Sequence, residues 1–243
     1  MMMPATRFTP ETISAVVFDI GGVFTYPQYR PVHQALAAMG LRRPADVLAY
    51  RRAHHRGVRA LADAMFDPEQ PTTDEADRSV WVHYDQAYAE HLGVDEQYRA
   101  DLAVAMRNTW DWVHVDNVAA FHRLNASGMP TAIVSNNDGT AVQQMTDYGI
   151  CQIGPGPLPS VATIVDSTEL GVAKPDPAIF APALDALGLD PATVLYVGDT
   201  VHADVLGATQ AGMQVVQLDP FDDHTDFEHA RVATVDDVVA ALT

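Results

Sequence analysis

Apolar residues follow two different spacings along the chain, and the changes of spacing divide it into three parts. The first part is a short β-branched run, residues 13–18, which ends at Asp19 and predicts a buried strand of a parallel sheet. In residues 27–112 the apolar and aromatic positions have helical spacing, with almost no strand candidates. After Trp112, strands and helices alternate. The pattern predicts an α/β fold with a doubly wound parallel sheet and an α-helical domain inserted between its first two strands.

The same spacings, together with Gly and Pro breaks, predict the individual elements. In the insertion, helices are expected over residues 31–39, 45–65, 74–92 and 95–109, with breaks at Gly40, Asp67-Pro68, Pro71 and Gly93. In the alternating part, strands are expected over residues 131–135, 163–165, 194–197 and 214–218, and helices over residues 118–125, 139–148, 179–187, 204–210 and 235–242. The core is therefore expected to comprise residues 1–25 and 114–243, and the insertion residues 26–113.

Composition narrows the classes of function. A formal net charge of −18 argues against nucleic acid and anionic membranes as partners, because both attract basic surfaces. A small phosphorylated metabolite stays compatible with this charge if a metal ion supplies local positive charge. We expect neither a signal peptide nor a membrane span, since no apolar run approaches about 20 residues. Cys151 is the single cysteine, so no internal disulfide forms. The expected protein is cytoplasmic, as a monomer or a homodimer.

Polar side chains stand where the predicted strands end. Asp19 ends the first strand, Ser135 ends the strand at 131–135, and Asp199 follows the strand at 194–197, with Asp204 shortly after it. The carboxyl ends of parallel strands share one edge of a sheet, so these side chains are expected to converge. Carboxylates that lie so close raise each other's pKa unless a cation separates them. Hard oxygen ligands favour Mg²⁺, which we expect as the cofactor.

The chain contains one lysine, Lys174. Asp176 can cap a helix whose first residue is Pro177, so Lys174 is expected just before a helix start, at the end of an incoming strand. An ammonium at that place suits a phosphate or a carboxylate. The alternative is a surface lysine in an arginine-rich composition.

Four segments, taken in order, resemble the motifs of the haloacid dehalogenase (HAD) superfamily of hydrolases. They are Phe18-Asp19-Ile20-Gly21-Gly22-Val23, Ile133-Val134-Ser135-Asn136-Asn137, Gly171-Val172-Ala173-Lys174-Pro175-Asp176-Pro177 and Val197-Gly198-Asp199-Thr200-Val201-His202-Ala203-Asp204. The resemblance covers most of the chain outside the insertion, which looks like the helical (C1-type) cap of the family. It implies a Rossmann-like HAD core and a phosphatase-like hydrolase.

The resemblance implies a role for each matching residue. Asp19 would be the nucleophile that forms an aspartyl-phosphate, and Lys174 would neutralise charge on Asp19 and on the transferring group. Mg²⁺ would be held by Asp19, the Gly21 carbonyl and Asp199, with Asp204 as a further ligand or as a residue that orients the others. The phosphoryl oxygens would be bound by Ser135, by Lys174 and by the backbone N–H groups of Gly21, Gly22 and Asn136.

The chain departs from the family pattern at Gly21. Most phosphatases of the family carry a second Asp there, which serves as general acid and base, and losing such a group costs about 10²–10⁴-fold in rate. Three outcomes stay open. The substrate has a good leaving group, as in the Asp-x-Gly-Gly-Val branch that includes sugar-1-phosphate phosphatases; or a cap residue substitutes, with His54, His55, Tyr26 and Tyr29 as candidates; or the chain is a catalytically degenerate binding or regulatory protein.

Two other activities of the superfamily are alternatives to the phosphatase hypothesis. A 2-haloacid dehalogenase also lacks the second Asp, but it needs no metal, and the acidic residues Asp199 and Asp204 favour a cation. A phosphonoacetaldehyde hydrolase uses a cap lysine as a Schiff base, and the insertion contains no lysine. A metal-dependent hydrolase of a small phosphate monoester is therefore the leading hypothesis.

Arginines crowd the second predicted helix of the insertion. Arg52, Arg56 and Arg59 can share one helical face. Arg52, His55 and Arg56 are therefore candidate contacts to an anionic substrate. The alternative is a solvated helix whose arginines pair with acidic residues.

Overall fold

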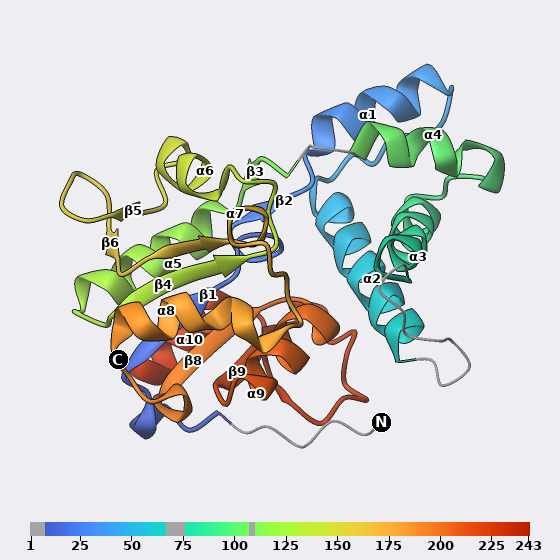
Figure 1. Ribbon diagram of the computed structural model, residues 1–243. Coiled ribbons are helices and arrows are strands. Elements are labelled where there is room, and N and C mark those ends of the chain that lie inside the picture. The colour runs from blue at the N-terminus through green and yellow to red at the C-terminus, as the bar shows by residue number, and fades with distance from the viewer. Residues whose placement is uncertain (1–7, 67–75, 107–109) are drawn as a thin grey trace. The chain divides into compact units, whose positions relative to one another are not determined.

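Six parallel strands form the central sheet of the protein, in a computed structural model that describes residues 8–66, 76–106 and 110–243, without the side chains of residues 76–80 (Figure 1). The strand order is β10-β9-β8-β1-β4-β7. The bounds are β1 Ala15–Phe18, β4 Thr131–Ser135, β7 Ile164–Asp166, β8 Val194–Gly198, β9 Gln214–Leu218 and β10 Ala230–Val232. All neighbouring strands run parallel, which confirms the predicted α/β class.

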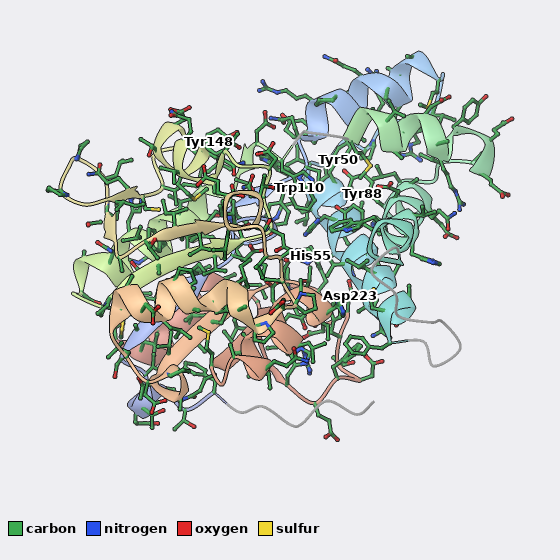
Figure 2. All side chains as sticks on the ribbon, in the orientation of Figure 1. Tyr50, His55, Tyr88, Trp110, Tyr148 and Asp223 are labelled. Carbon is green, nitrogen blue, oxygen red and sulfur yellow. The ribbon has the colours of Figure 1, made fainter. Side chains whose placement is uncertain are left out.

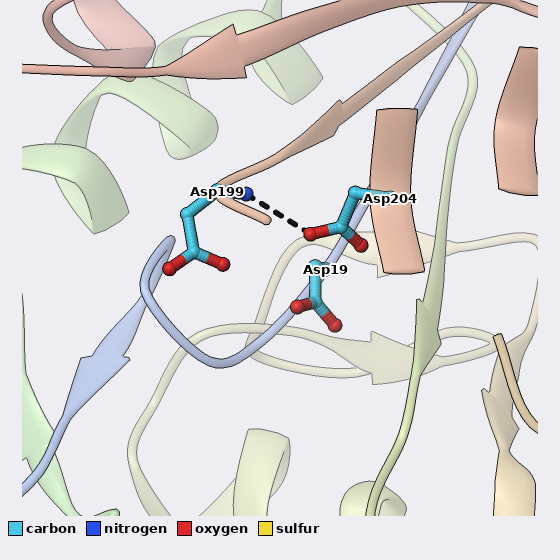
Figure 3. A group of neighbouring side chains, drawn as sticks. All are labelled: Asp19, Asp199 and Asp204. Atoms are coloured by element: carbon cyan, nitrogen blue, oxygen red, sulfur yellow. Dashed lines mark hydrogen bonds between the residues drawn. The ribbon is translucent and has the colours of Figure 1, made fainter. Parts of the chain in front are cut away.

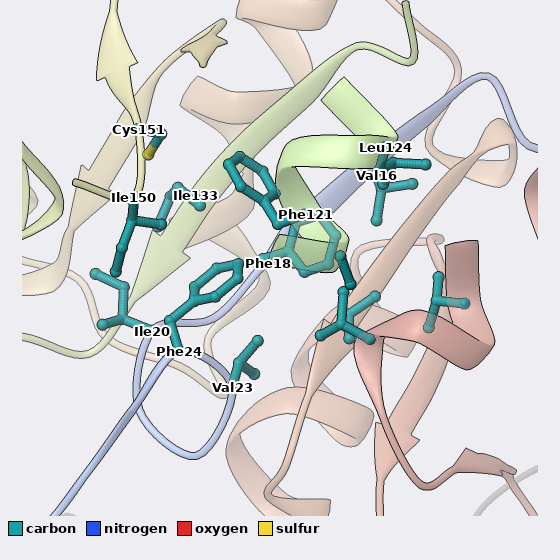
Figure 4. Packing of buried hydrophobic residues seen from close by; sticks show 14 of the residues in the cluster. Val16, Phe18, Ile20, Val23, Phe24, Phe121, Leu124, Ile133, Ile150 and Cys151 are labelled. Atoms are coloured by element: carbon teal, nitrogen blue, oxygen red, sulfur yellow. The ribbon is translucent and has the colours of Figure 1, made fainter. Parts of the chain in front are cut away.

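Alternating side chains of the strands build a core on each face of the sheet. Val16 and Phe18 of β1 belong to one cluster, with α5 (Val115–Ala126) and α10 (Val235–Leu242). Phe18 packs edge-on against Phe121 at 5.5 Å between ring centroids (Figure 4). Ala15 and Val17 belong to the other cluster, with the 3₁₀ turn Pro177–Phe180 and α8 (Ala181–Leu187). Because side chains alternate with a period of two, a strand buried on both faces reads as a continuous apolar run.

The chain falls into two compact units, each described here by itself. The smaller one holds Thr25–Trp112 and the segment Phe221–His224, and the larger one holds the sheet and its flanking helices. The helices of the smaller unit are α1 Tyr29–Ala38, α2 Leu48–Met65, α3 Ala76–His91 and α4 Glu96–Met106. Aromatic side chains form much of its own core, among them Tyr50, Tyr88 and Trp110 (Figure 2). Two short strands, β2 (Thr25–Tyr26) and β3 (Trp112–Val113), pair with each other.

Several elements differ from the sequence-based expectation. The helix expected over residues 204–210 begins earlier, as a π-helix over Val201–Leu206 that continues as α9 (Gly207–Gln210). The elements without a clear signal include the short strands β2 and β3, the strand β10 and the helix α7 (Ser167–Leu170). They also include the pair β5 (Gln152–Ile153) and β6 (Ser160–Val161), which flank the Gly-Pro loop. The remaining helix of the alternating part is α6 (Ala141–Asp147).

Some expectations fall on residues that the structure does not describe. These are the breaks at Asp67-Pro68 and Pro71 and the predicted helix ends at Asp74 and Thr109. In the described ranges, no helix combines the length and the apolar content that a membrane span needs.

Candidate active site

Asp19 and Asp199 meet at the carboxyl edge of the sheet because their strands are direct neighbours. Phe18 of β1 pairs in register with Val197 of β8, and the Asp19 N–H donates to the Val197 carbonyl at 2.9 Å. Asp204 comes from the π-helix Val201–Leu206 that follows β8. One carboxylate oxygen from each of Asp19, Asp199 and Asp204 lies within 4.8 Å of the others, and all three residues are buried (Figure 3). The predicted convergence of these carboxylates is present in the larger unit.

Asp204 is held by hydrogen bonds to both of its carboxylate oxygens. Oδ2 accepts from the backbone N–H groups of Asp199 and Thr200, at 3.1 and 2.9 Å, and from Thr200 Oγ1 at 2.8 Å. Oδ1 accepts from Lys174 Nζ at 2.6 Å and from the Tyr196 hydroxyl at 3.0 Å. Burial alone would raise the pKa of Asp204, but Lys174 and the Thr200 hydrogen bonds outweigh it, and the pKa is lowered. Asp204 is thus an ionised group that organises its neighbours.

This network explains why the helix after β8 begins before the expected residue. The N–H groups of Asp199 and Thr200 lie at the start of the helix and need acceptors. Asp204 supplies an acceptor from within the first turn of the helix rather than from its N-cap position. The sequence pattern places an Asp at a helix start, but it does not distinguish these two arrangements.

Lys174 lies among three oxygen atoms. Its Nζ donates to Asp204 Oδ1 and, at 2.9 Å, to the Tyr196 hydroxyl, and lies 2.8 Å from Asp19 Oδ1. Burial would lower the pKa of Lys174, but Asp19 and Asp204 outweigh it and raise the pKa. Lys174 is 3% exposed, so the alternative of a surface lysine is wrong.

The main chain of Lys174 is positioned differently from the sequence-based expectation. Lys174 follows α7 and a turn, not a strand. Its backbone N–H donates to Asn136 Oδ1 at 2.8 Å, and its carbonyl accepts from Asn136 Nδ2 at 3.0 Å. Asp176 does cap the turn at Pro177, since its side chain accepts from the Ala178 N–H. The Asn136 side-chain amide therefore satisfies the backbone N–H and carbonyl of Lys174, as a neighbouring strand would do for a residue within a sheet.

The Asp19 carboxylate is short of compensating charge. Burial raises the pKa of Asp19 most, Lys174 lowers it, and Asp204 and Asp199 raise it, so that the resulting pKa is about 7. Asp19 Oδ1 faces Lys174, but it has no hydrogen bond of normal geometry with the residues that the structure describes. A divalent cation would supply the missing charge, and hard carboxylate oxygens suit Mg²⁺. The donor set at this edge of the sheet therefore fits such an ion.

Two glycines allow these carboxylates to approach the backbone. Gly22 has a φ of +68°, and a Cβ there would lie 2.0 Å from Asp199 Oδ2. A Cβ on Gly198 would lie 2.3 Å from Asp204 Cγ. Gly21 and Gly22 belong to the turn that the Phe24 N–H closes on the Ile20 carbonyl at 2.8 Å. Glycine at positions 22 and 198 thus has a steric cause.

The predicted phosphate-binding and substrate-contact residues fall into different units. Ser135, buried at the end of β4, belongs to the larger unit with the carboxylates. Arg52, His55 and Arg56 lie on α2 of the smaller unit. Arg52 stands 4.9 Å from the Phe221 ring centroid, and Arg56 pairs with Asp223 at 3.0 Å. His55 is buried, with Nε2 3.4 Å from the Tyr26 hydroxyl.

Tyr196 and Thr200 contact the candidate site and were not predicted from the sequence. Tyr196 is fully buried in β8, where its ring packs edge-on against Phe180 at 5.1 Å between centroids. Burial, with the nearby Asp204 and Asp19, raises its pKa well above the ordinary value, so the hydroxyl stays protonated. The available signal was a phenol inside an apolar strand immediately before Gly198-Asp199, because buried Tyr hydroxyls seek a partner.

Comparison with known proteins finds phosphatase-named relatives and a shared fold. A glyceraldehyde 3-phosphate phosphatase from Methanopyrus kandleri is 40% identical in an alignment of 89 residues, which covers 32% of this chain and 38% of that protein. The chain thus spans about two fifths of the length of that relative. A ribulose-1,5-bisphosphate 5-phosphatase from Halopiger xanaduensis is 25% identical in an alignment of 237 residues, which covers 91% of each chain.

The fold is shared with solved structures. A HAD-hydrolase from Bacillus subtilis, solved bound to magnesium, has a TM-score of 0.59 at 15% identity and covers 95% of this chain and 99% of that one. At this identity the likeness concerns the fold alone. A family model described as haloacid dehalogenase-like hydrolase matches residues 13–212 of the 243. The chain therefore belongs to the haloacid dehalogenase-like hydrolases.

Proposed function

We propose that the protein is a Mg²⁺-dependent phosphatase that hydrolyses a small phosphate monoester through an aspartyl-phosphate on Asp19. The observation that carries the proposal is the buried group of Asp19, Asp199 and Asp204 beside Lys174. The phosphatase names of the similar proteins from Methanopyrus kandleri and Halopiger xanaduensis support the reaction class.

Mg²⁺ would be held by Asp19, the Gly21 carbonyl and Asp199. Both carboxylate oxygens of Asp204 already accept hydrogen bonds, so its proposed part is to fix the Asp199–Thr200 backbone and Lys174. When bound, the ion neutralises charge on the transferring phosphoryl group and on Asp19. Ser135, Lys174 and the N–H groups of Gly21, Gly22 and Asn136 are the proposed phosphate ligands.

The chemistry divides into two displacements at phosphorus. A carboxylate oxygen of Asp19 forms a bond to phosphorus while the bond to the substrate oxygen breaks, and that oxygen leaves with the bonding pair and takes up a proton. Water then forms a bond to phosphorus while the bond from phosphorus to the Asp19 oxygen breaks, and the proton that water loses passes to the released phosphate or to solvent. This step releases inorganic phosphate and restores the Asp19 carboxylate. Lys174, held against Asp19, balances charge in both steps.

Gly21 limits the substrates that we propose. No carboxylate at this position protonates the leaving oxygen, so a group that leaves without strong acid assistance is favoured. A sugar-1-phosphate, an acyl phosphate or an aryl phosphate has such a leaving group. His54 is a poor candidate for a substitute general acid, because its side chain is buried and its Nδ1 already lies 2.8 Å from the Tyr84 hydroxyl.

Hydrolysis of p-nitrophenyl phosphate tests the proposal, since its aryl leaving group needs little acid assistance. We expect turnover with Mg²⁺ that is lost on chelation. Asp19→Asn is expected to reduce kcat at least about a thousandfold, because it removes the nucleophile. Asp185→Asn, a change of the same kind on an exposed position of α8, is the control and should keep wild-type activity.

Other outcomes of the assay indicate other functions. Chloride release from a 2-haloacid that persists with chelator would indicate a dehalogenase instead. Wild-type protein without turnover of any phosphate ester would favour a binding or regulatory protein of the same fold. Asp19→Asn protein with full activity would instead mean that Asp19 is not the nucleophile.

A further inference from the structure

The hydroxyl of Tyr196 lies at the junction of three groups in the larger unit. It accepts a hydrogen bond from Lys174 Nζ at 2.9 Å, and it lies 3.0 Å from both Asp204 Oδ1 and the Val134 carbonyl oxygen. A phenol has one proton to donate, so it donates to one of these two oxygens at a time. Neither the HAD motifs of the sequence nor the proposed reaction assigns Tyr196 a part.

We propose that Tyr196 is a positioning residue, whose hydroxyl fixes the ammonium of Lys174 against the nucleophile Asp19. The inference rests on the proposed function, because it assigns a role within the same site. It adds a residue that contacts neither the substrate nor the metal ligand Asp199 in the proposed mechanism.

The arrangement around Lys174 explains why its ammonium requires a positioning residue. A lysine side chain is a flexible four-carbon chain that carries a point charge with three N–H donors. Asn136 holds the main chain of Lys174 through two hydrogen bonds, but these bonds do not set the torsion angles of the Lys174 side chain. Asp204 and Tyr196 each accept one N–H, and this directs the ammonium so that Nζ lies 2.8 Å from Asp19 Oδ1. Without Tyr196, one of the two acceptors that set this direction is lost.

A packing role for the ring is the competing explanation. The Tyr196 ring is fully buried and packs against Phe180. Tyr196→Phe keeps this ring contact and removes the hydroxyl alone, so the variant separates the two explanations. Tyr88→Phe is the matched control, because Tyr88 is equally buried and its hydroxyl has no hydrogen-bond partner among the described residues.

Kinetics with p-nitrophenyl phosphate and Mg²⁺ give the first readout. A hydrogen bond to a charged group is strong enough that its loss should lower kcat of Tyr196→Phe by about tenfold to a hundredfold. KM should stay close to the wild-type value, whereas the melting temperature should fall, because buried partners of the hydroxyl lose a hydrogen bond. In Tyr88→Phe, kcat, KM and the melting temperature should all stay close to the wild-type values. If the wild type is active and Tyr196→Phe keeps its kcat, the inference is wrong while the proposed function stands.

The single lysine of the chain provides a second readout that needs no activity. Protein labelled with ¹⁵N-lysine should give one side-chain ammonium signal, which reports on Lys174 alone. We expect Tyr196→Phe to shift this signal and to speed exchange of its protons with water at least severalfold, whereas Tyr88→Phe leaves both unchanged. An ammonium signal with the same shift and exchange rate in Tyr196→Phe would overturn the inference, whether or not the protein proves to be a phosphatase.

Discussion

At the scale of single residues, Cys151 has properties that its burial determines. It is fully buried in the core cluster that also holds Phe18, and burial raises the pKa of its thiol to about 12. We expect the native protein at pH 8 to resist a thiol reagent such as dithionitrobenzoate, and the denatured protein to release one equivalent. Fast labelling of the native protein would contradict this, because the reactive species is the exposed thiolate.

The raised pKa of Cys151 also has a consequence for stability. An acid whose folded-state pKa lies above its unfolded value favours the folded state only while it is neutral in both states. Its contribution is therefore complete below about pH 9 and is lost as the pH rises from about 9 towards about 12. Cys151→Ala should lose less stability over this range than the wild type, which unfolding curves at several pH values would measure.

Other single residues differ in how well the sequence predicted them. Lys174 was recognisable because it is the one lysine and stands in a motif. The roles of the Asn136 side chain and of Tyr196 were not recognisable, because their partners Lys174 and Asp204 come from other segments of the chain. A residue type indicates what a group is able to bond, whereas the fold decides which partner comes within reach.

At the scale of elements, the turn after β1 depends on Gly22. Gly22→Ala would add a Cβ at a positive φ and at 2.0 Å from Asp199 Oδ2. We expect a loss of about 1–2 kcal/mol from the backbone conformation, and a further loss because Asp199 must move. Phosphatase activity should also fall, because Asp199 is displaced. Thermal unfolding and p-nitrophenyl phosphate kinetics measure these effects.

Gly40 provides the control for this prediction. It has a similar φ of +71°, and no heavy atom lies within 4 Å of the position of a Cβ. Gly40→Ala should therefore show the backbone cost without the displacement of Asp199, and activity should be retained. Equal losses of stability and activity in the two variants would mean that contact with Asp199 is not what requires Gly22.

The elements themselves were predictable to different degrees. The strand predicted over residues 131–135 coincides with β4, since an apolar run buried on both faces has few alternatives. The strand β10 was not predicted, because its three residues are only partly buried and include Arg231. The π-helix at Val201–Leu206 depends on the hydrogen bonds of Asp204, which a helical periodicity does not encode.

At the scale of the whole molecule, bound Mg²⁺ should stabilise the fold. A ligand at 100 times its Kd adds about 2.7 kcal/mol, which corresponds to roughly 5–10 °C in Tm for a chain of this length. We expect this shift with Mg²⁺ but not with Na⁺ at equal ionic strength. Asp199→Asn should abolish it and Asp185→Asn should retain it, as measured by thermal unfolding with and without chelator.

The comparison at equal ionic strength is needed because of the net charge of −18. Any salt screens the mutual repulsion of the acidic side chains and stabilises the compact state. A Tm shift that is equal for the wild type and Asp199→Asn would therefore be a general effect of charge screening, and it would count against a specific metal site.

The sequence by itself determined the α/β class, the presence of a helical insertion and the acidic residues that follow the strands. These features are local, because apolar spacing and motif order are properties of contiguous segments. Only the tertiary structure decided that Asp204 uses both carboxylate oxygens in hydrogen bonds and that Tyr196 holds Lys174. Such contacts depend on distances between segments that lie far apart in sequence, and strand order sets those distances: β8 and β4 both pair with β1, which brings Asp199, Asp19 and Ser135 to neighbouring strand ends.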